Sequence, residues 1–367
     1  MNIAFTGIRG IPACYSGFET FVEKFAEGLV RDGYLVTVYN RQYINYKGEG
    51  YNGIRIIRLP TIKMKHLDTI FHTFLSVIHC LFCRYDIVYV CGVGNSPLIF
   101  IPRLVGSKVI INVDGLDWSR EKWSPFAKLY LKVCEVWAII FANVVITDSR
   151  FVQSYYRNTY SKETVYISYG AQIRTRGNAY EIDILKKFGL EKDKYILFIS
   201  RLVPENGAHI LIEAYNMLRT DLKLVIAGNA TYSDRYIESL KSAKSLPMIF
   251  TGFVFGQEYN QLMRNAYIFV LPSMVSGTRV VLLEAMAFSN CVLVNNCESN
   301  MEVVGDAGYS YNGQYGTVAL RDGLQYLIDN PDIVISYRQK AVERIKKFYS
   351  WDEKILEYKI IFSRWKK

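Results

Sequence analysis

Short apolar runs alternate with amphipathic segments along most of this 367-residue chain. In the first half, the runs predict strands at residues 2–6, 34–39, 54–58, 86–91, 108–113 and 143–147. Between the first two runs, residues 18–30 predict a helix with one apolar face, formed by Phe18, Phe21, Val22, Phe25 and Leu29. This alternation of strands and helices predicts a doubly wound, largely parallel α/β sheet.

A second α/β series follows a polar stretch at residues 172–178, which we interpret as an inter-domain linker. The series predicts strands at 195–200, 222–227, 248–250, 267–271 and 291–295, with helices at 208–218 and 280–288. An amphipathic helix at residues 351–366 closes the chain. We therefore expect two similar domains, at residues 1–171 and 172–350, and a C-terminal helical segment at 351–367.

Composition and charge narrow the class of protein. Half of the residues are hydrophobic, which excludes a disordered chain. The formal charge of +10 is spread, with an excess of six in residues 1–170 and four in the rest. This spread suits small polyanionic ligands or an anionic membrane surface, and we expect no nucleic acid partner. Seven cysteines, several of them in apolar runs, favour reduced cytoplasmic thiols, and the first strand lacks a signal peptide's basic region.

The most hydrophobic segment covers residues 67–83 and is too short and interrupted to span a bilayer. Lys63, Lys65 and His66 precede it. A core helix and a helix lying on a membrane surface both fit this pattern. We expect peripheral contact with anionic membrane at the inner face of the plasma membrane.

The first strand is followed by a long loop, at residues 7–17, that ends at the predicted helix. It lacks the Gly-x-Gly-x-x-Gly dinucleotide fingerprint, and Pro12 removes a backbone donor. Extra length at the carboxyl end of a strand is typical of a ligand-facing loop. Gly17 would let the backbone approach a phosphate or sugar at the helix N-terminus, although a purely structural turn also fits.

Two loops of the second half carry candidate chemistry. Arg201 follows a strand directly, and its planar guanidinium suits a diphosphate. Residues 273–278 precede an apolar helix and could cradle phosphate oxygens with backbone N–H groups. Within that helix, Glu284 could accept hydrogen bonds from the two vicinal hydroxyls of a ribose, or it could be a buried carboxylate satisfied locally. The sequence offers no histidine and cysteine arrangement typical of a metal site.

These motifs resemble the retaining family-4 glycosyltransferases of GT-B fold, in particular the bacterial rhamnosyltransferase-like branch. The similar segments lie in order along the chain, at residues 7–20, 92–95, 112–118, 169–171, 201–206 and 277–287. The resemblance implies two Rossmann-like domains facing across a cleft, with the C-terminal helix returning to the first domain.

The resemblance also implies roles by position. Glu284 would hold the donor ribose, Arg201 the diphosphate and Gly17 the phosphates, with Asp114 near the sugar and acceptor. The remaining donor-binding positions implied are Asn206, Ser276, Gly277 and Thr278.

Three positions depart from the wider family. Ser276 stands where a Glu is common, Asn206 where a Lys is common, and Asp114 where a His is common. The diphosphate is therefore expected to be neutralised differently. Arg279 either replaces some of the lost positive charge or faces outward from the helix.

We interpret the chain as a glycosyltransferase, with no cofactor and no metal, that uses a nucleoside-diphosphate sugar. The branch resembled favours transfer of L-rhamnose from dTDP-rhamnose to a lipid-linked or growing cell-surface glycan of O-antigen or capsule type. Retention of anomeric configuration is implied by the resemblance only. The alternatives are a nucleotide-sugar epimerase of similar architecture and a non-catalytic nucleotide-sugar-binding subunit.

Overall fold

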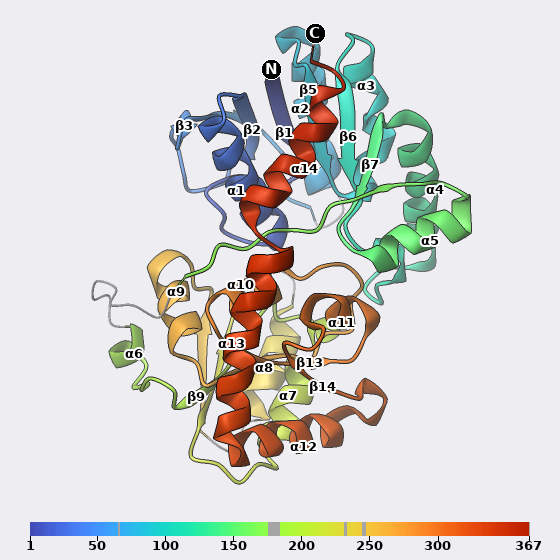
Figure 1. Ribbon diagram of the computed structural model, residues 1–367. Coiled ribbons are helices and arrows are strands. Elements are labelled where there is room, and N and C mark those ends of the chain that lie inside the picture. The colour runs from blue at the N-terminus through green and yellow to red at the C-terminus, as the bar shows by residue number, and fades with distance from the viewer. Residues whose placement is uncertain (65–66, 175–183, 231–232, 244–246, 367) are drawn as a thin grey trace. The chain divides into compact units, whose positions relative to one another are not determined.

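A computed structural model describes residues 1–64, 67–174, 184–230, 233–243 and 247–366 (Figure 1). The chain divides into two compact units. Unit 1 comprises Met1–Gly170, Ser276–Thr278 and the C-terminal residues from Trp351, whereas unit 2 comprises Ala171–Val275 and Arg279–Ser350. Part of the predicted linker, residues 175–178, lies outside the described residues, as do Lys65 and His66 of the predicted membrane-contacting segment.

Unit 1 is built on an eight-stranded sheet with the order β3-β4-β2-β1-β5-β6-β7-β8. All neighbouring strands are parallel except β3 and β4, which form an antiparallel pair at the edge. The elements are β1 (Asn2–Thr6), α1 (Gly17–Arg31), β2 (Leu35–Arg41), β3 (Gly50–Tyr51), β4 (Ile54–Leu59), α2 (Asp68–Cys83), β5 (Ile87–Cys91), η1 (Val93–Leu98), α3 (Phe100–Arg103), β6 (Lys108–Asn112), η2 (Asp117–Ser119), α4 (Pro125–Phe141), β7 (Val144–Thr147), α5 (Arg150–Tyr160) and β8 (Val165–Tyr166).

The central strands of unit 1 are apolar because helices cover both faces of a parallel sheet. Every residue of β5 is buried. One core cluster includes Val88 and Val90 of β5, Ile111 of β6, and Leu131 and Ala138 of α4. The carboxyl ends of β1, β5, β6 and β7 therefore reach the same edge of the sheet, where ligands bind in open α/β folds.

Unit 2 holds a six-stranded, wholly parallel sheet with the order β11-β10-β9-β12-β13-β14. Its elements are α6 (Ile184–Lys187), β9 (Tyr195–Ile199), η3 (Pro204–Asn206), α7 (Ala208–Tyr215), β10 (Lys223–Ala227), α8 (Asp234–Ser242), β11 (Met248–Gly252), α9 (Gly256–Asn265), β12 (Ile268–Leu271), α10 (Val280–Ala287), β13 (Cys291–Asn295), α11 (Glu298–Val304), β14 (Tyr309–Tyr311), η4 (Gly313–Tyr315), α12 (Gly316–Asp329) and α13 (Pro331–Phe348).

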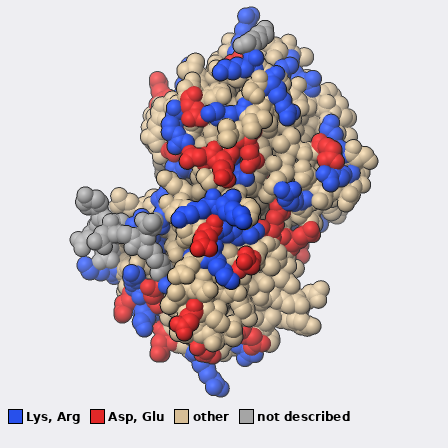
Figure 2. All heavy atoms as spheres, viewed as in Figure 1, with Lys and Arg blue, Asp and Glu red and all other residues tan. Residues whose placement is uncertain are grey.

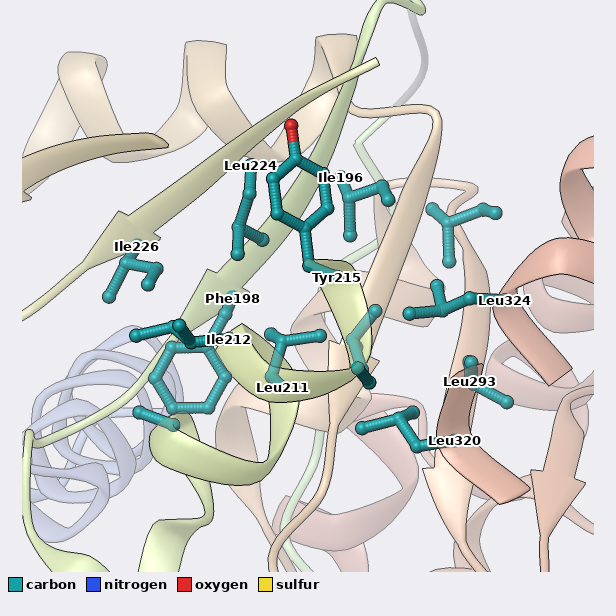
Figure 3. Packing of buried hydrophobic residues seen from close by; sticks show 14 of the residues in the cluster. Ile196, Phe198, Leu211, Ile212, Tyr215, Leu224, Ile226, Leu293, Leu320 and Leu324 are labelled. Atoms are coloured by element: carbon teal, nitrogen blue, oxygen red, sulfur yellow. The ribbon is translucent and has the colours of Figure 1, made fainter. Parts of the chain in front are cut away.

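The core of unit 2 lies between this sheet and its helices (Figure 3). Ile196 and Phe198 of β9 pack with Leu211 and Ile212 of α7, while Leu324 of α12 joins the same cluster. The two parallel-sheet, Rossmann-like domains predicted from the sequence are confirmed.

The last helix, α14 (Trp351–Ser363), packs against α1 within unit 1 (Figure 1). The ring centroids of Phe25 and Tyr358 are 4.3 Å apart, and the hydroxyls of Tyr89 and Tyr358 are joined by a hydrogen bond of 2.9 Å. At Gly28 a Cβ atom would lie only 2.1 Å from Cδ1 of Ile355. The absence of a side chain at this position is therefore what allows the two helices to approach.

Charges of both signs lie on the face of the molecule that Figure 2 shows. On the face in Figure 2, Lys and Arg side chains form several groups with Asp and Glu beside them. Among the described helices, none combines the length and the apolar character needed to cross a bilayer.

Candidate functional site

Arg201 lies at the carboxyl edge of the unit 2 sheet, two residues after β9 ends. Its side chain is half-buried. The loop that carries it closes on itself, because Nδ2 of Asn206 donates to the main-chain oxygen of Arg201 at 2.8 Å. Gly207 follows with a φ of +75°, and a Cβ there would lie 2.8 Å from Cβ of Pro272. Only glycine fits here without strain. Its small size lets the Arg201 loop lie directly against the loop that follows β12.

Arg279 lies beside the same loop. It is the N-cap residue of α10, and its Nη2 donates to Oδ1 of Asn206 at 3.1 Å and to Oγ of Ser273 at 2.7 Å. The Asn206 amide therefore bonds the backbone of Arg201 on one side and the guanidinium of Arg279 on the other. Of the two placements left open by the sequence, the structure has the arginine beside the Arg201 loop rather than outward from the helix.

Glu284 occupies the second turn of α10 and is half-buried. Its Oε2 accepts a hydrogen bond from the hydroxyl of Tyr259, on α9, at 2.6 Å. Burial raises the pKa of Tyr259 well above its usual value, and the nearby Glu284 carboxylate adds to this shift. The phenol therefore stays protonated and donates to the carboxylate, which fixes one oxygen of Glu284 in place.

In unit 1, the loop between β1 and α1 is held by carboxylates of α1. Glu19 is buried and accepts hydrogen bonds from the amide of Arg9 at 2.9 Å and from the hydroxyl of Ser16. Glu23 accepts from the amide of Ala13 at 2.7 Å. Gly17 is exposed and is the first residue of α1, so the backbone at the helix start is accessible.

Asp114 lies two residues after β6, at the carboxyl edge of the unit 1 sheet. Its backbone has a φ of +58°, and its amide donates to Oδ1 of Asn112 at 2.9 Å. Tyr169 donates to Oδ1 of Asp114 at 3.2 Å. Burial raises the pKa of Tyr169 well above its usual value, with a further contribution from the Asp114 charge, so this phenol is also a donor.

The segment Ser276–Thr278 belongs to unit 1 rather than to the unit that holds Glu284. Oγ of Ser276 accepts from the amide of Leu116 at 2.9 Å. The amide of Thr278 donates to Oδ2 of Asp148, and its hydroxyl donates to the main-chain oxygen of Asp148, both at 2.6 Å. Gly277 lies between them and is buried. The amide of Thr278, predicted to face a phosphate, is thus bonded to a carboxylate in this structure.

Sequence reasoning missed Asp148 and Tyr259. Asp148 is buried and follows β7 directly, whereas Asp114 lies two residues after the end of β6. A carboxylate after an apolar run was therefore the available signal. Tyr259 gave no such signal, because its partner Glu284 lies 25 residues away and the two meet only where the fold brings α9 beside α10.

The absence of a metal site can be stated for the described part of the chain. There, no cluster of three or more His, Cys, Asp or Glu side chains has an arrangement that could hold an ion.

Two family models match this sequence. Residues 181–348 match "Glycosyl transferases group 1", and residues 1–172 match "Domain of unknown function (DUF1972)". An uncharacterized glycosyltransferase of Methanocaldococcus jannaschii is 27% identical over 98% of each chain.

A shorter similarity is to a Campylobacter jejuni protein, the N-acetylgalactosamine-N,N'-diacetylbacillosaminyl-diphospho-undecaprenol 4-alpha-N-acetylgalactosaminyltransferase. It is 30% identical over 47% of this chain and 48% of its own. Among solved structures, Anabaena HepE in complex with UDP and glucose superposes with a TM-score of 0.81, at 18% identity, over 99% of this chain and 100% of that one. The fold is therefore the GT-B fold.

Proposed function

We propose that this chain, whose residues 181–348 match the group 1 glycosyltransferase model, moves a sugar from a nucleoside diphosphate to a hydroxyl of a lipid-linked or growing cell-surface glycan. The name of the C. jejuni relative supports a diphospho-lipid acceptor, and the UDP and glucose bound to HepE support a nucleotide-sugar donor. The donor that we favour is dTDP-rhamnose, on the resemblance of the sequence motifs.

The observation that carries this proposal is that the side chain of Asn206 bonds both the main chain of Arg201 and the guanidinium of Arg279 at the carboxyl edge of the unit 2 sheet. In the reaction, the bond between the anomeric carbon and the diphosphate breaks, the acceptor oxygen bonds that carbon, and the hydroxyl proton passes to an oxygen of the departing diphosphate. Negative charge grows on the departing diphosphate. Preorganised guanidinium groups stabilise such charge strongly, and this is usually the largest contribution an active site makes.

Arg279 also accounts for the absence of the family's lysine at position 206. An asparagine cannot neutralise a phosphate, but its Oδ1 holds the guanidinium of Arg279 at 3.1 Å. We assign to Arg279 the positive charge that a lysine would bring. Glu284, held by Tyr259, would bind the ribose hydroxyls, with Gly17 near the phosphates and Asp114 near the sugar and acceptor. In this proposal, transfer retains the anomeric configuration and needs no metal.

The donor can be identified by thermal unfolding with a panel of dTDP-, UDP- and GDP-sugars. A donor at 100 times its dissociation constant should add about 2.7 kcal/mol of stability. Release of nucleoside diphosphate should then require a lipid-linked acceptor. Conversion of the sugar nucleotide in the absence of an acceptor would indicate an epimerase. Binding of the sugar nucleotide with no transfer to any acceptor tested would indicate a non-catalytic subunit.

The arginines are tested with Arg201→Ala and Arg279→Ala, using Arg235→Ala on the exposed face of α8 as the control. Each site variant should slow transfer by roughly 10- to 150-fold, because a hydrogen bond to a charged group contributes about 1.5–3 kcal/mol. The control should transfer at the parental rate. If both site variants are folded and also match the parent, the diphosphate is bound elsewhere.

A further inference from the structure

Helix α4 carries a row of large apolar side chains that the fold of unit 1 leaves uncovered. Phe126, Leu129 and Ile140 are 82%, 63% and 60% exposed, and Val133 and Val136 are also exposed. Their spacing of three or four residues places them along one side of the helix. The opposite side, with Leu131, Cys134 and Ala138, is buried in the core of unit 1.

Helix α3 lies beside the C-terminal end of α4 (Figure 1). The ring of Phe100 lies 6.5 Å from that of Trp137 and 6.3 Å from that of Phe141. Nη1 of Arg103 donates to the main-chain oxygen of Phe141 at 2.6 Å. Just past α3, Leu104 is 73% exposed. We call the resulting surface the α3–α4 face and define it by Leu104, Phe126, Leu129, Val133, Val136 and Ile140.

Basic side chains border this face. Residues 120–141 contain four Lys or Arg and two Glu. One of those acids, Glu135, is buried, where it accepts hydrogen bonds from Tyr155 and Tyr160 at 2.9 and 2.6 Å. Arg103, Lys122 and Glu121 are exposed, and the other three basic residues of the segment are half-buried, so cations outnumber the one exposed acid. An exposed apolar row with a cationic border is the composition of surfaces that lie on anionic bilayers.

Aromatic side chains at the rim support the same partner. The hydroxyl of Tyr130 donates to the main-chain oxygen of Gly94 at 2.9 Å, while its ring is exposed to solvent. Trp123 and Trp137 are half-buried. Tyrosine and tryptophan favour the boundary between lipid headgroups and acyl chains.

We propose that the α3–α4 face docks the chain on an anionic lipid bilayer. This proposal rests on the proposed function, because a lipid-linked acceptor lies in a membrane. The segment that the sequence suggested for membrane contact was instead residues 67–83. That helix, α2, buries Val77 and Cys80 and exposes Phe74 and Phe82, so only part of it is available to lipid.

The test uses the purified full-length chain and sedimentation with vesicles of neutral phosphatidylcholine, or of the same lipid with phosphatidylglycerol. The parent should bind the anionic vesicles, and added salt should weaken the binding. Leu129→Glu combined with Ile140→Glu should lower binding by at least about tenfold, because two apolar side chains are lost from the face. The control is Leu356→Glu with Ile360→Glu on α14, where the parent residues are 55% and 56% exposed.

Each outcome decides the proposal. It is overturned if the parent binds neither vesicle, if the α4 variant binds as the parent does, or if the control loses binding equally. It is also overturned if the parent is a dimer that the α4 variant dissociates without any vesicle binding, since the face would then hold a second copy. Leu129→Trp with Ile140→Trp, which keeps the face apolar, should bind at least as well as the parent. Transfer to a short-chain, water-soluble analogue of the lipid-linked acceptor should be unchanged in the α4 variant, which separates docking from the chemistry.

Discussion

Replacing Glu284 tests the donor site most directly, because this carboxylate is the side chain that we assign to the ribose. One of its oxygens already accepts a hydrogen bond of 2.6 Å from Tyr259. A hydrogen bond to a charged group contributes about 1.5–3 kcal/mol. Glu284→Ala should therefore weaken donor binding or slow transfer by roughly 10- to 150-fold.

The same substitution also removes the acceptor of the Tyr259 hydroxyl, which should lower the free energy of unfolding by about 1 kcal/mol. Glu284→Gln separates the two effects. Its amide oxygen can still accept from Tyr259, so the stability should be nearly parental, while the loss of charge should leave donor affinity between those of the parent and the alanine variant. Tyr259→Phe should reduce donor affinity less than Glu284→Ala, because the carboxylate remains but is less firmly oriented.

Donor affinity is measured by calorimetric titration with the nucleotide sugar identified by the panel, and stability by urea unfolding. Glu238→Ala, on the exposed side of α8, serves as the matched control and should change neither quantity. The assignment is wrong if Glu284→Ala is folded by circular dichroism, binds the donor as tightly as the parent and transfers sugar at the parental rate.

Two further predictions concern stability. His72 is fully buried, and burial, followed by the charge of Arg41, lowers its pKa from 6.5 to about 4. Because the folded-state pKa is the lower one, the stabilisation is present above pH 6.5 and is lost as the pH falls toward 4, by roughly 3 kcal/mol. Urea unfolding at pH 7 and 4.5 should show a smaller pH dependence for His72→Leu than for the parent, and equal dependences would contradict this. Removing every residue after Ser350 deletes α14 and uncovers the apolar side of α1, so the product should be unstable or insoluble. A soluble, fully active truncation would refute this role of α14.

The strands were predictable from sequence where the apolar run is bounded by polar residues on both sides. Residues 291–295 were predicted and form β13 with the same bounds, and residues 267–271 differ from β12 by one residue. The antiparallel strand β3 was missed, because two residues at a sheet edge show no periodicity. Helix α4 was missed as well, since both its buried and its exposed sides are apolar and the pattern lacks a polar face.

The candidate site was predictable only in part, because sequence motifs identify residues and not their partners. Glu284 and Arg201 stood out through their positions in loops and helices. The hydrogen bond from Arg279 to Asn206 spans 73 residues and depends on how two loops meet at the end of a parallel sheet. The bonds from Thr278 to Asp148 span 130 residues. Local patterns carry no information at such separations.

Because α14 belongs to unit 1, the ribosome finishes this unit last. Residues 1–170 emerge early, but the helix that covers Phe25 and Gly28 begins only at Trp351. At synthesis rates of about 5–20 residues per second, the intervening residues take roughly 10 to 40 s to be made. Throughout that interval the aromatic surface around Phe25 stays exposed, because α14 has not yet been synthesised. Chaperones that bind exposed apolar segments would meet this surface on every molecule synthesised, and a product of premature termination would keep it exposed permanently.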